Sequence, residues 1–173
     1  MALTLLRHAA LSPQHQGRYN GWTDISIDPT LYEEHKVTLL KTQHFDKIYC
    51  SDLKRTQETL EAMGMETYIK DERLREVRFK IHIEGLHFDE VRKLASFDER
   101  YLESQERWYR YICAENPAQF ERRIQQFLTE LPKDQEILIC SHGGTLQKIL
   151  SFCGYNKAHI NYLEWIRIEN GLQ

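Results

Sequence analysis

Arginine and histidine side chains follow the ends of three short strand-like runs in this sequence. Arg7 and His8 come directly after one run, His142 comes just after another, and Arg55 lies in the segment SDLKRTQET that follows a third. A guanidinium carries a planar fork of donors that matches the oxygens of a phosphoryl group, and it stays charged at any working pH. The combination therefore predicts a site for a phosphoryl dianion.

The two histidines suit different parts of phosphoryl transfer. Guanidiniums nearby disfavour a protonated imidazole, so we expect His8 to be neutral at pH 7 and to attack phosphorus through a lone pair. We expect His142 to hydrogen-bond an equatorial phosphoryl oxygen. The backbone amides of Gly143, Gly144 and Thr145 are expected to be free for the same anion, because they begin a helix.

Hydrolysis also needs a carboxyl group that protonates the departing alkoxide and later activates water. Glu76, in the segment RLREVRF, is the candidate. The remaining histidines fit no ligand spacing such as H-E-x-x-H, so neither a metal nor a cofactor is expected. These are His15, His35, His44, His82, His87 and His159.

The elements that must position these residues alternate along the chain, which indicates an α/β fold with a mostly parallel central sheet. The expected strands are residues 3–6, 47–50, 66–69, 136–140 and, at an edge, 162–168. The expected helices are residues 31–43, 52–63, 88–94, 98–113, 117–131 (capped by Asn116) and 145–152. Ligands of such sheets bind beyond the carboxyl ends of the strands, so the residues above are expected to meet at one edge.

Composition limits the classes of protein to consider. The chain has 173 residues, 41% of them hydrophobic, and a formal net charge of −3, which suits one domain over residues 1–173 and argues against nucleic-acid binding. No apolar run is long enough to span a membrane, so no membrane partner is expected and a cytoplasmic location is predicted. The widely spaced Cys50, Cys113, Cys140 and Cys153 are expected to be buried thiols.

Four segments together resemble the histidine phosphatase superfamily, whose type members are cofactor-dependent phosphoglycerate mutases. LLRH at residues 5–8 resembles the strand-end R-H-G signature, and SDLKRT at residues 51–56 resembles S-x-L-x-R-[AT]. GRYNGWTDISI at residues 17–27 resembles the mutase and ribazole-phosphatase segment around G-x-x-D, and CSHGG at residues 140–144 resembles the second histidine motif.

The resemblance implies a three-layer α/β/α sandwich, with a helical insert at about residues 86–115. It implies that His8 becomes phosphorylated, that Arg7, Arg55 and His142 bind the phosphoryl group, and that Glu76 is the proton donor. Gln14 stands where relatives often carry a phosphate-binding asparagine and is expected to take that role.

Two of the departures from the family pattern bear directly on the site. Ala9 replaces the glycine after the Arg-His pair, which adds a methyl group to the loop. After Glu76, the usual F-G-x-W-E-G becomes FKIHIEG at residues 79–85, with one extra residue and no tryptophan. Residues around Trp22 and 80–88, with the insert, are therefore expected to set specificity, whereas Trp108, Tyr109 and Tyr111 are interpreted as helix-packing residues.

The function expected first is a metal-independent phosphomonoesterase that acts on a small phosphorylated metabolite through a phosphohistidine, with ribazole phosphate as one candidate substrate. The chain is shorter than the mutases of the family, which carry an insertion that closes the site. Three alternatives stay open: a phosphoglycerate mutase-type phosphotransferase, a phosphoprotein (phosphohistidine) phosphatase, and a non-catalytic module that binds phosphoryl ligands. The oligomeric state is left open.

Overall fold

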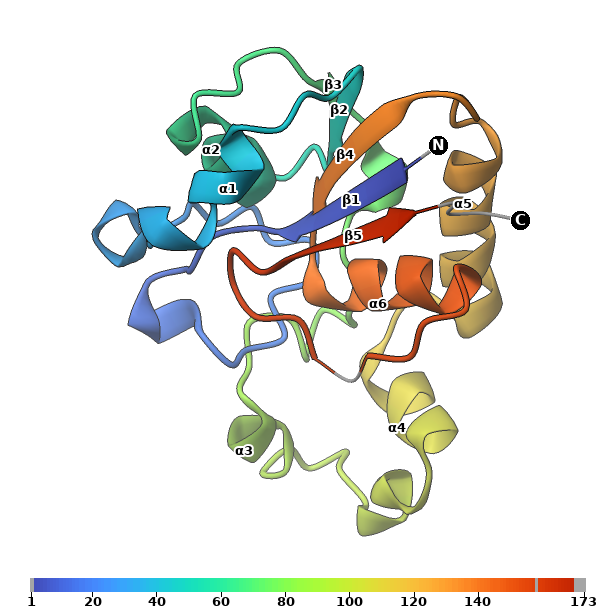
Figure 1. Cartoon of the computed structure of the whole chain (residues 1–173). Coiled ribbons are helices and arrows are strands. Elements are labelled where there is room, and N and C mark those ends of the chain that lie inside the picture. Colours follow the sequence, from blue (N-terminus) through green and yellow to red (C-terminus); the bar gives the residue numbers. More distant parts are fainter. Residues whose placement is uncertain (1, 158, 170–173) are drawn as a thin grey trace.

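The computed structural model of the chain, which describes residues 2–157 and 159–169, has a five-stranded sheet at its centre (Figure 1). The strands are β1 (Ala2–Arg7), β2 (Lys47–Cys50), β3 (Ile69–Lys70), β4 (Glu136–Ser141) and β5 (Trp165–Glu169), and their order is β3-β2-β4-β1-β5. Only the edge strand β5 is antiparallel to its neighbour among these pairs. The predicted mostly parallel sheet and the predicted edge strand are confirmed.

Helices cover both faces of the sheet. Figure 1 shows α1 (Thr38–Lys41) and α2 (Lys54–Ala62) on one side, and α5 (Pro117–Thr129) and α6 (Gly143–Phe152) on the other. Side chains of β4 alternate between the two sides, since Ile137 packs in one apolar core with α5 and α6 while Leu138 packs in a second core with α1 and α2. The three-layer α/β/α sandwich is thereby confirmed.

Two further helices, α3 (Phe88–Val91) and α4 (Gln105–Ile112), lie below the sheet in Figure 1. A 3-10 helix at Glu99–Glu103 precedes α4, and the Ser104 side chain accepts a hydrogen bond from the Arg107 amide to begin α4. The continuous helix predicted over residues 98–113 is therefore wrong in its middle, because Ser104 is an N-cap.

The helix predicted over residues 31–43 is also wrong. The chain forms 3-10 turns at Pro29–Leu31 and Glu34–Lys36 before the single turn of α1. Asp28 accepts a hydrogen bond from the Thr30 amide and so closes the first turn locally. The cap predicted at Asn116 is confirmed, because its side chain accepts a hydrogen bond from the amide of Gln119.

Most of the cysteine side chains are buried. Cys50, Cys113 and Cys140 are buried as predicted, whereas Cys153 is half-buried. Burial raises the pKa of Cys50 and of Cys113 to about 12, so neither is a reactive thiolate near neutral pH.

Over residues 2–157 and 159–169, no helix combines the length and the apolar character needed to cross a membrane.

Candidate active site

The ends of β1 and β4 bring the two histidines together. These strands pair in parallel with Arg7 opposite Ser141, and the amide of His8 donates to the carbonyl oxygen of Ser141 at 3.0 Å. His8 and His142 each follow one of these paired residues, and their ring centroids are 5.3 Å apart. The predicted meeting of the two histidines at one sheet edge is what the structure shows.

The His8 imidazole is held in a form that can act as a nucleophile. Its Nδ1 lies 2.8 Å from the carbonyl oxygen of Ala9, and a carbonyl can only accept, so the proton is on Nδ1 and the lone pair is on Nε2. Burial, and then the charges of Arg55 and Arg7, hold the pKa of His8 well below its usual range. His8 is therefore neutral at pH 7.

Ala9 fits its position without disturbing this loop. Its amide donates to Oγ1 of Thr59 at 2.9 Å, and its side chain is fully buried in the core that contains Leu6 and Leu60. The methyl group that replaces the family's glycine therefore packs against α2 rather than into the site.

The His142 imidazole is a hydrogen-bond donor toward the site. Its Nδ1 accepts from Nε of Arg55 at 3.1 Å, and its pKa is held well below the usual range by burial and then by the charge of Arg55. A neutral imidazole that accepts at Nδ1 carries its proton on Nε2. That Nε2 is buried and has no hydrogen-bond partner in the structure, so its N–H is available to a ligand oxygen.

Arg55 is held from three directions in the first turn of α2. Besides His142, its guanidinium donates to the carbonyl oxygens of Thr23 at 2.8 Å and Gly21 at 2.7 Å. Glu84 fixes that loop by accepting from the Thr23 amide at 2.7 Å. Burial lowers the pKa of Arg55 to about 10, which leaves the group cationic at neutral pH.

Arg7 lies against an aromatic ring at the site. Its guanidinium carbon is 4.2 Å from the centroid of the Tyr162 ring, and one terminal nitrogen donates to the carbonyl oxygen of Ile160. The buried Nε of Arg7 has no hydrogen-bond partner, so this donor, like that of His142, is available. Tyr162 also contacts the His8 ring, with centroids 5.4 Å apart.

Glu76 enters the site from the loop after β3. Its Oε2 accepts from the amide of Gly144 at 2.9 Å and its Oε1 from the amide of Val77 at 2.9 Å. A Cβ atom at Gly144 would lie 2.5 Å from Oε1, so only glycine permits this approach. The prediction that the Gly144 amide is free for an anion is therefore wrong, because Glu76 occupies it.

These groups line a cavity of about 170 Å³. Its lining residues are Arg7, His8, Leu11, Gly17, Arg18, Asn20, Gly21, Arg55, Glu76, Phe79, His142, Gly143 and Tyr162. The predicted catalytic and phosphate-binding side chains are all among them except Gln14. Gln14 is exposed, and its amide lies 3.3 Å from Nε2 of His15.

Among the lining residues with polar side chains, sequence reasoning missed three: Arg18, Asn20 and Tyr162. Arg18 and Asn20 lie in the GRYNGW segment, so their neighbourhood carried a signal. Asn20 donates from Nδ2 to the carbonyl oxygen of His15 at 2.6 Å, whereas its buried Oδ1 has no partner. Tyr162 carried no signal of its own, because it was predicted only as the first residue of an alternating strand, whereas β5 begins at Trp165.

The arrangement is suited to a tetrahedral dianion. Two guanidiniums and the His142 N–H surround the lone pair of His8, and a carboxyl group lies on the wall of the same cavity. Charge-assisted bonds from such donors are strongest where water is excluded. Within residues 2–157 and 159–169, no group of three or more His, Cys, Asp and Glu side chains has an arrangement that could hold a metal ion.

Comparison with protein families gives a match over residues 3–171, to the model described as the histidine phosphatase superfamily (branch 1). Phosphoserine phosphatase 1 of Hydrogenobacter thermophilus is 30% identical over 155 residues, which cover 81% of this chain and 70% of that protein. The 6-phosphofructo-2-kinase/fructose-2,6-bisphosphatase of Gallus gallus is 25% identical over 154 residues. The match covers 87% of this chain, but the chain spans only 32% of the length of that relative.

Solved structures share the fold of this chain. The protein TTHB049 of Thermus thermophilus superposes with a TM-score of 0.76 at 25% identity and covers 98% of this chain and 94% of that one. A phosphoglycerate mutase of Bacillus anthracis superposes with a TM-score of 0.76 at 21% identity over 99% of this chain and 89% of that one, which shows a common fold.

Proposed function

The chain belongs to the histidine phosphatase superfamily, and from this premise we propose that it is a metal-independent phosphomonoesterase for a small phosphorylated metabolite. The observation that carries the proposal is that several side-chain nitrogens of one cavity have no hydrogen-bond partner in the protein. The lone pair of His8 Nε2 faces a site where the buried Nε of Arg7 and Nε2 of His142 have no protein partner. The named phosphatases among the relatives support hydrolysis.

The first step transfers the phosphoryl group to His8. Arg7, Arg55 and His142 hold the phosphoryl oxygens while Nε2 of His8 forms a bond to phosphorus. The ester P–O bond breaks, its electron pair goes to the leaving oxygen, and the protonated carboxyl of Glu76 gives that oxygen a proton. The Nδ1–H bond to Ala9 stabilises the charge that develops on the imidazole ring.

The second step returns the enzyme to its starting state. Water attacks phosphorus and gives a proton to the Glu76 carboxylate, while the P–N bond breaks and its electron pair returns to Nε2. Inorganic phosphate leaves, His8 is again neutral, and Glu76 is again protonated. Hydrogen bonds from the backbone amides of Gly144 and Val77 hold the carboxyl group on the cavity wall for both proton transfers.

Asn20 supports a substrate class. Its unpartnered Oδ1 repels phosphate oxygens but accepts from a hydroxyl or ammonium group. We therefore expect a phosphomonoester whose alcohol part carries such a donor close to the ester oxygen. The phosphoserine phosphatases among the relatives support a substrate of this kind.

The test is hydrolysis of p-nitrophenyl phosphate with a chelator present, for the wild type and His8→Ala. We expect turnover by the wild type, a loss of at least about a thousandfold in the variant, and an acid-labile, base-stable phosphoprotein after rapid quenching of the wild type only. His44→Ala is the control, because that side chain is 84% exposed.

Two results would count against the proposal. An active His8→Ala variant would exclude His8 as the nucleophile. Nitrophenol released without an equal amount of inorganic phosphate would indicate transfer to another acceptor, as in a mutase.

A further inference from the structure

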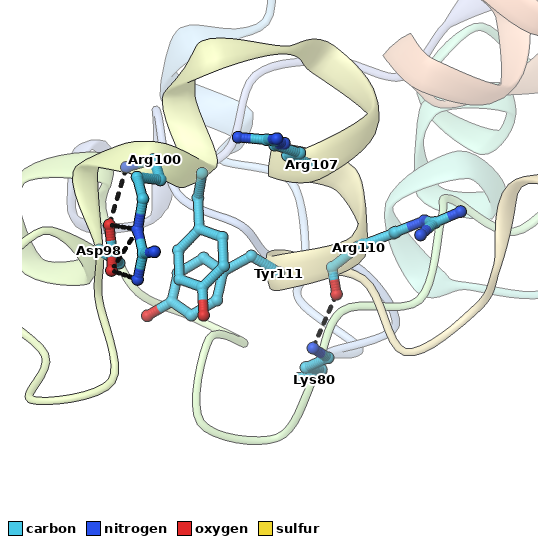
Figure 2. A pocket seen from close by; sticks show the side chains of 7 residues that line it. Lys80, Asp98, Arg100, Arg107, Arg110 and Tyr111 are labelled. Atoms are coloured by element: carbon cyan, nitrogen blue, oxygen red, sulfur yellow. Dashed lines mark hydrogen bonds and ion pairs between the residues drawn. The ribbon is translucent and has the colours of Figure 1, made fainter.

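A second cavity, of about 450 Å³, lies among the segments around α4, and most of its lining side chains are cationic (Figure 2). We name it the basic hollow, and its lining residues are Lys80, Asp98, Arg100, Tyr101, Arg107, Arg110 and Tyr111. Four of these seven side chains are cations and one is an anion, although the chain as a whole has a net charge of −3. The proposed phosphatase reaction uses none of these residues.

The base of the basic hollow is a rigid aromatic pair. Tyr101 and Tyr111 stack with centroids 4.3 Å apart and rings 8° from parallel. Tyr111 is buried, and its hydroxyl lies 3.1 Å from Oγ of Ser96. Cations from three separate segments therefore gather around a floor that is already ordered.

The cations can exchange their present partners for a bound anion. Arg100 pairs with Asp98, Arg107 with Glu103 and Arg110 with Glu106. Every one of these ion pairs includes well-exposed side chains, and exposed pairs contribute little stability. Lys80 instead donates to the carbonyl oxygen of Arg110 at 2.8 Å, as Figure 2 shows, so this bond leaves its charge uncompensated.

The basic hollow is distinct from the catalytic cavity. Phe79 lines the catalytic cavity, whereas its neighbour Lys80 lines the basic hollow. Phe79 bridges to Cys113, and the amide of Lys80 donates to the carbonyl oxygen of Ile112 at 2.9 Å. Consecutive side chains of such an extended segment point to opposite sides. Residues 79 and 80 are therefore a wall between two cavities.

The geometry points to the basic hollow as a binding site for a small polyanion, a metabolite that carries two or more phosphate or carboxylate groups, separate from the phosphoryl pocket. Arg107 and Arg110 contribute forked donors from α4, and Lys80 adds a point charge from the neighbouring extended segment. Two or more anionic groups are needed to engage cations that come from different segments.

The experiment is calorimetric titration of inorganic tripolyphosphate into the His8→Ala protein at low ionic strength, so that the probe is not consumed. We expect a binding site that remains when Arg7→Gln weakens the phosphoryl pocket. The double variant Lys80→Gln/Arg107→Gln should lose about tenfold or more in affinity, because two charge-assisted contacts are removed. The matched control is Arg92→Gln/Lys93→Gln, which removes the same charge from exposed residues that do not line the hollow.

A third arm, Arg7→Gln, separates the two cavities. Affinity that is unchanged in this variant supports the basic hollow, whereas affinity that falls with it places the probe in the phosphoryl pocket and overturns the inference. An equal loss in the control double variant overturns it as well, because binding would then follow net charge alone. Thermal unfolding of each variant checks that the fold is retained.

Discussion

Arg55 donates its Nε–H to Nδ1 of His142 at 3.1 Å, and this bond determines which nitrogen of His142 carries the proton. With Nδ1 occupied as an acceptor, the proton of the neutral ring must be on Nε2, which has no protein partner. Arg55 thus has two functions in the site. It adds positive charge, and it orients a neutral histidine as a donor.

Replacing Arg55 by lysine should separate these two functions. Lysine keeps a positive charge but cannot bond His142, Gly21 and Thr23 from one planar group. We expect kcat/KM for p-nitrophenyl phosphate to fall by about a hundredfold or more. Steady-state kinetics checks this, with the exposed neighbour Lys54→Arg as control, and a loss below about threefold would show that charge alone is sufficient.

Adding a methyl group at Gly144 should displace Glu76. The Cβ atom of Gly144→Ala would lie 2.5 Å from Oε1 of Glu76, so the carboxyl group has to move. Proton donation matters most for poor leaving groups, so we expect at least about a tenfold loss on an alkyl phosphate and a smaller loss on p-nitrophenyl phosphate.

The ratio of the two rates in that variant is the readout, with Ser151→Ala on the exposed side of α6 as control. Equal losses on both substrates would show that Glu76 is not the proton donor.

The ring of Tyr162, rather than its hydroxyl, should be what positions Arg7 and His8. The ring lies 4.2 Å from the guanidinium carbon of Arg7 and 5.4 Å from the His8 centroid. We expect Tyr162→Phe to keep kcat within about twofold, whereas Tyr162→Ala should reduce it by about fivefold, because the cation–π contact contributes about 1 kcal/mol. A large loss in the phenylalanine variant would assign a role to the hydroxyl group instead.

Stability should decrease as the solution becomes more acidic, through the two buried imidazoles. The pKa values of His8 and His142 are held well below their usual range in the fold, so the unfolded chain takes up protons that the native chain does not. Above about pH 6.5 this effect is absent. Below it, the free energy of unfolding should fall by up to about 1.4 kcal/mol per pH unit for each histidine.

Urea unfolding of the ligand-free protein between pH 7.5 and 5.5 measures this slope. His142→Gln should make the slope shallower, even if it also lowers stability at every pH. A wild-type slope of zero, or one of opposite sign, would show that the histidines are not held neutral.

The sequence predicted the parts of the site that depend on strand ends. Arg7, His8 and His142 meet because parallel strands place their carboxyl ends at one edge, and this follows from local pattern and general topology. Gln14 was misplaced because the direction of a loop side chain depends on packing that no local pattern encodes. Tyr162 and Asn20 were missed for the same reason.

Some helix boundaries were likewise predicted from local signals, and others were missed. α5 was predicted with its cap because Asn116 and Pro117 are local signals. The turns at residues 29–36 were missed because hydrogen bonds of Asp28 compete with helix formation there. The domain extent of 1–173 with an insert at 86–115, the cytoplasmic location and the absence of a nucleic-acid partner stay predictions.

The pairing of Arg7 with Ser141 has a consequence for how the site comes into existence. Residues more than 130 positions apart must meet before any phosphoryl pocket exists, so no local fragment of the chain can bind the ligand. Protection by phosphate against proteolysis would then report on closure of the β1–β4 pair itself. In that sense the ligand is a probe for a long-range step of folding as much as for catalysis.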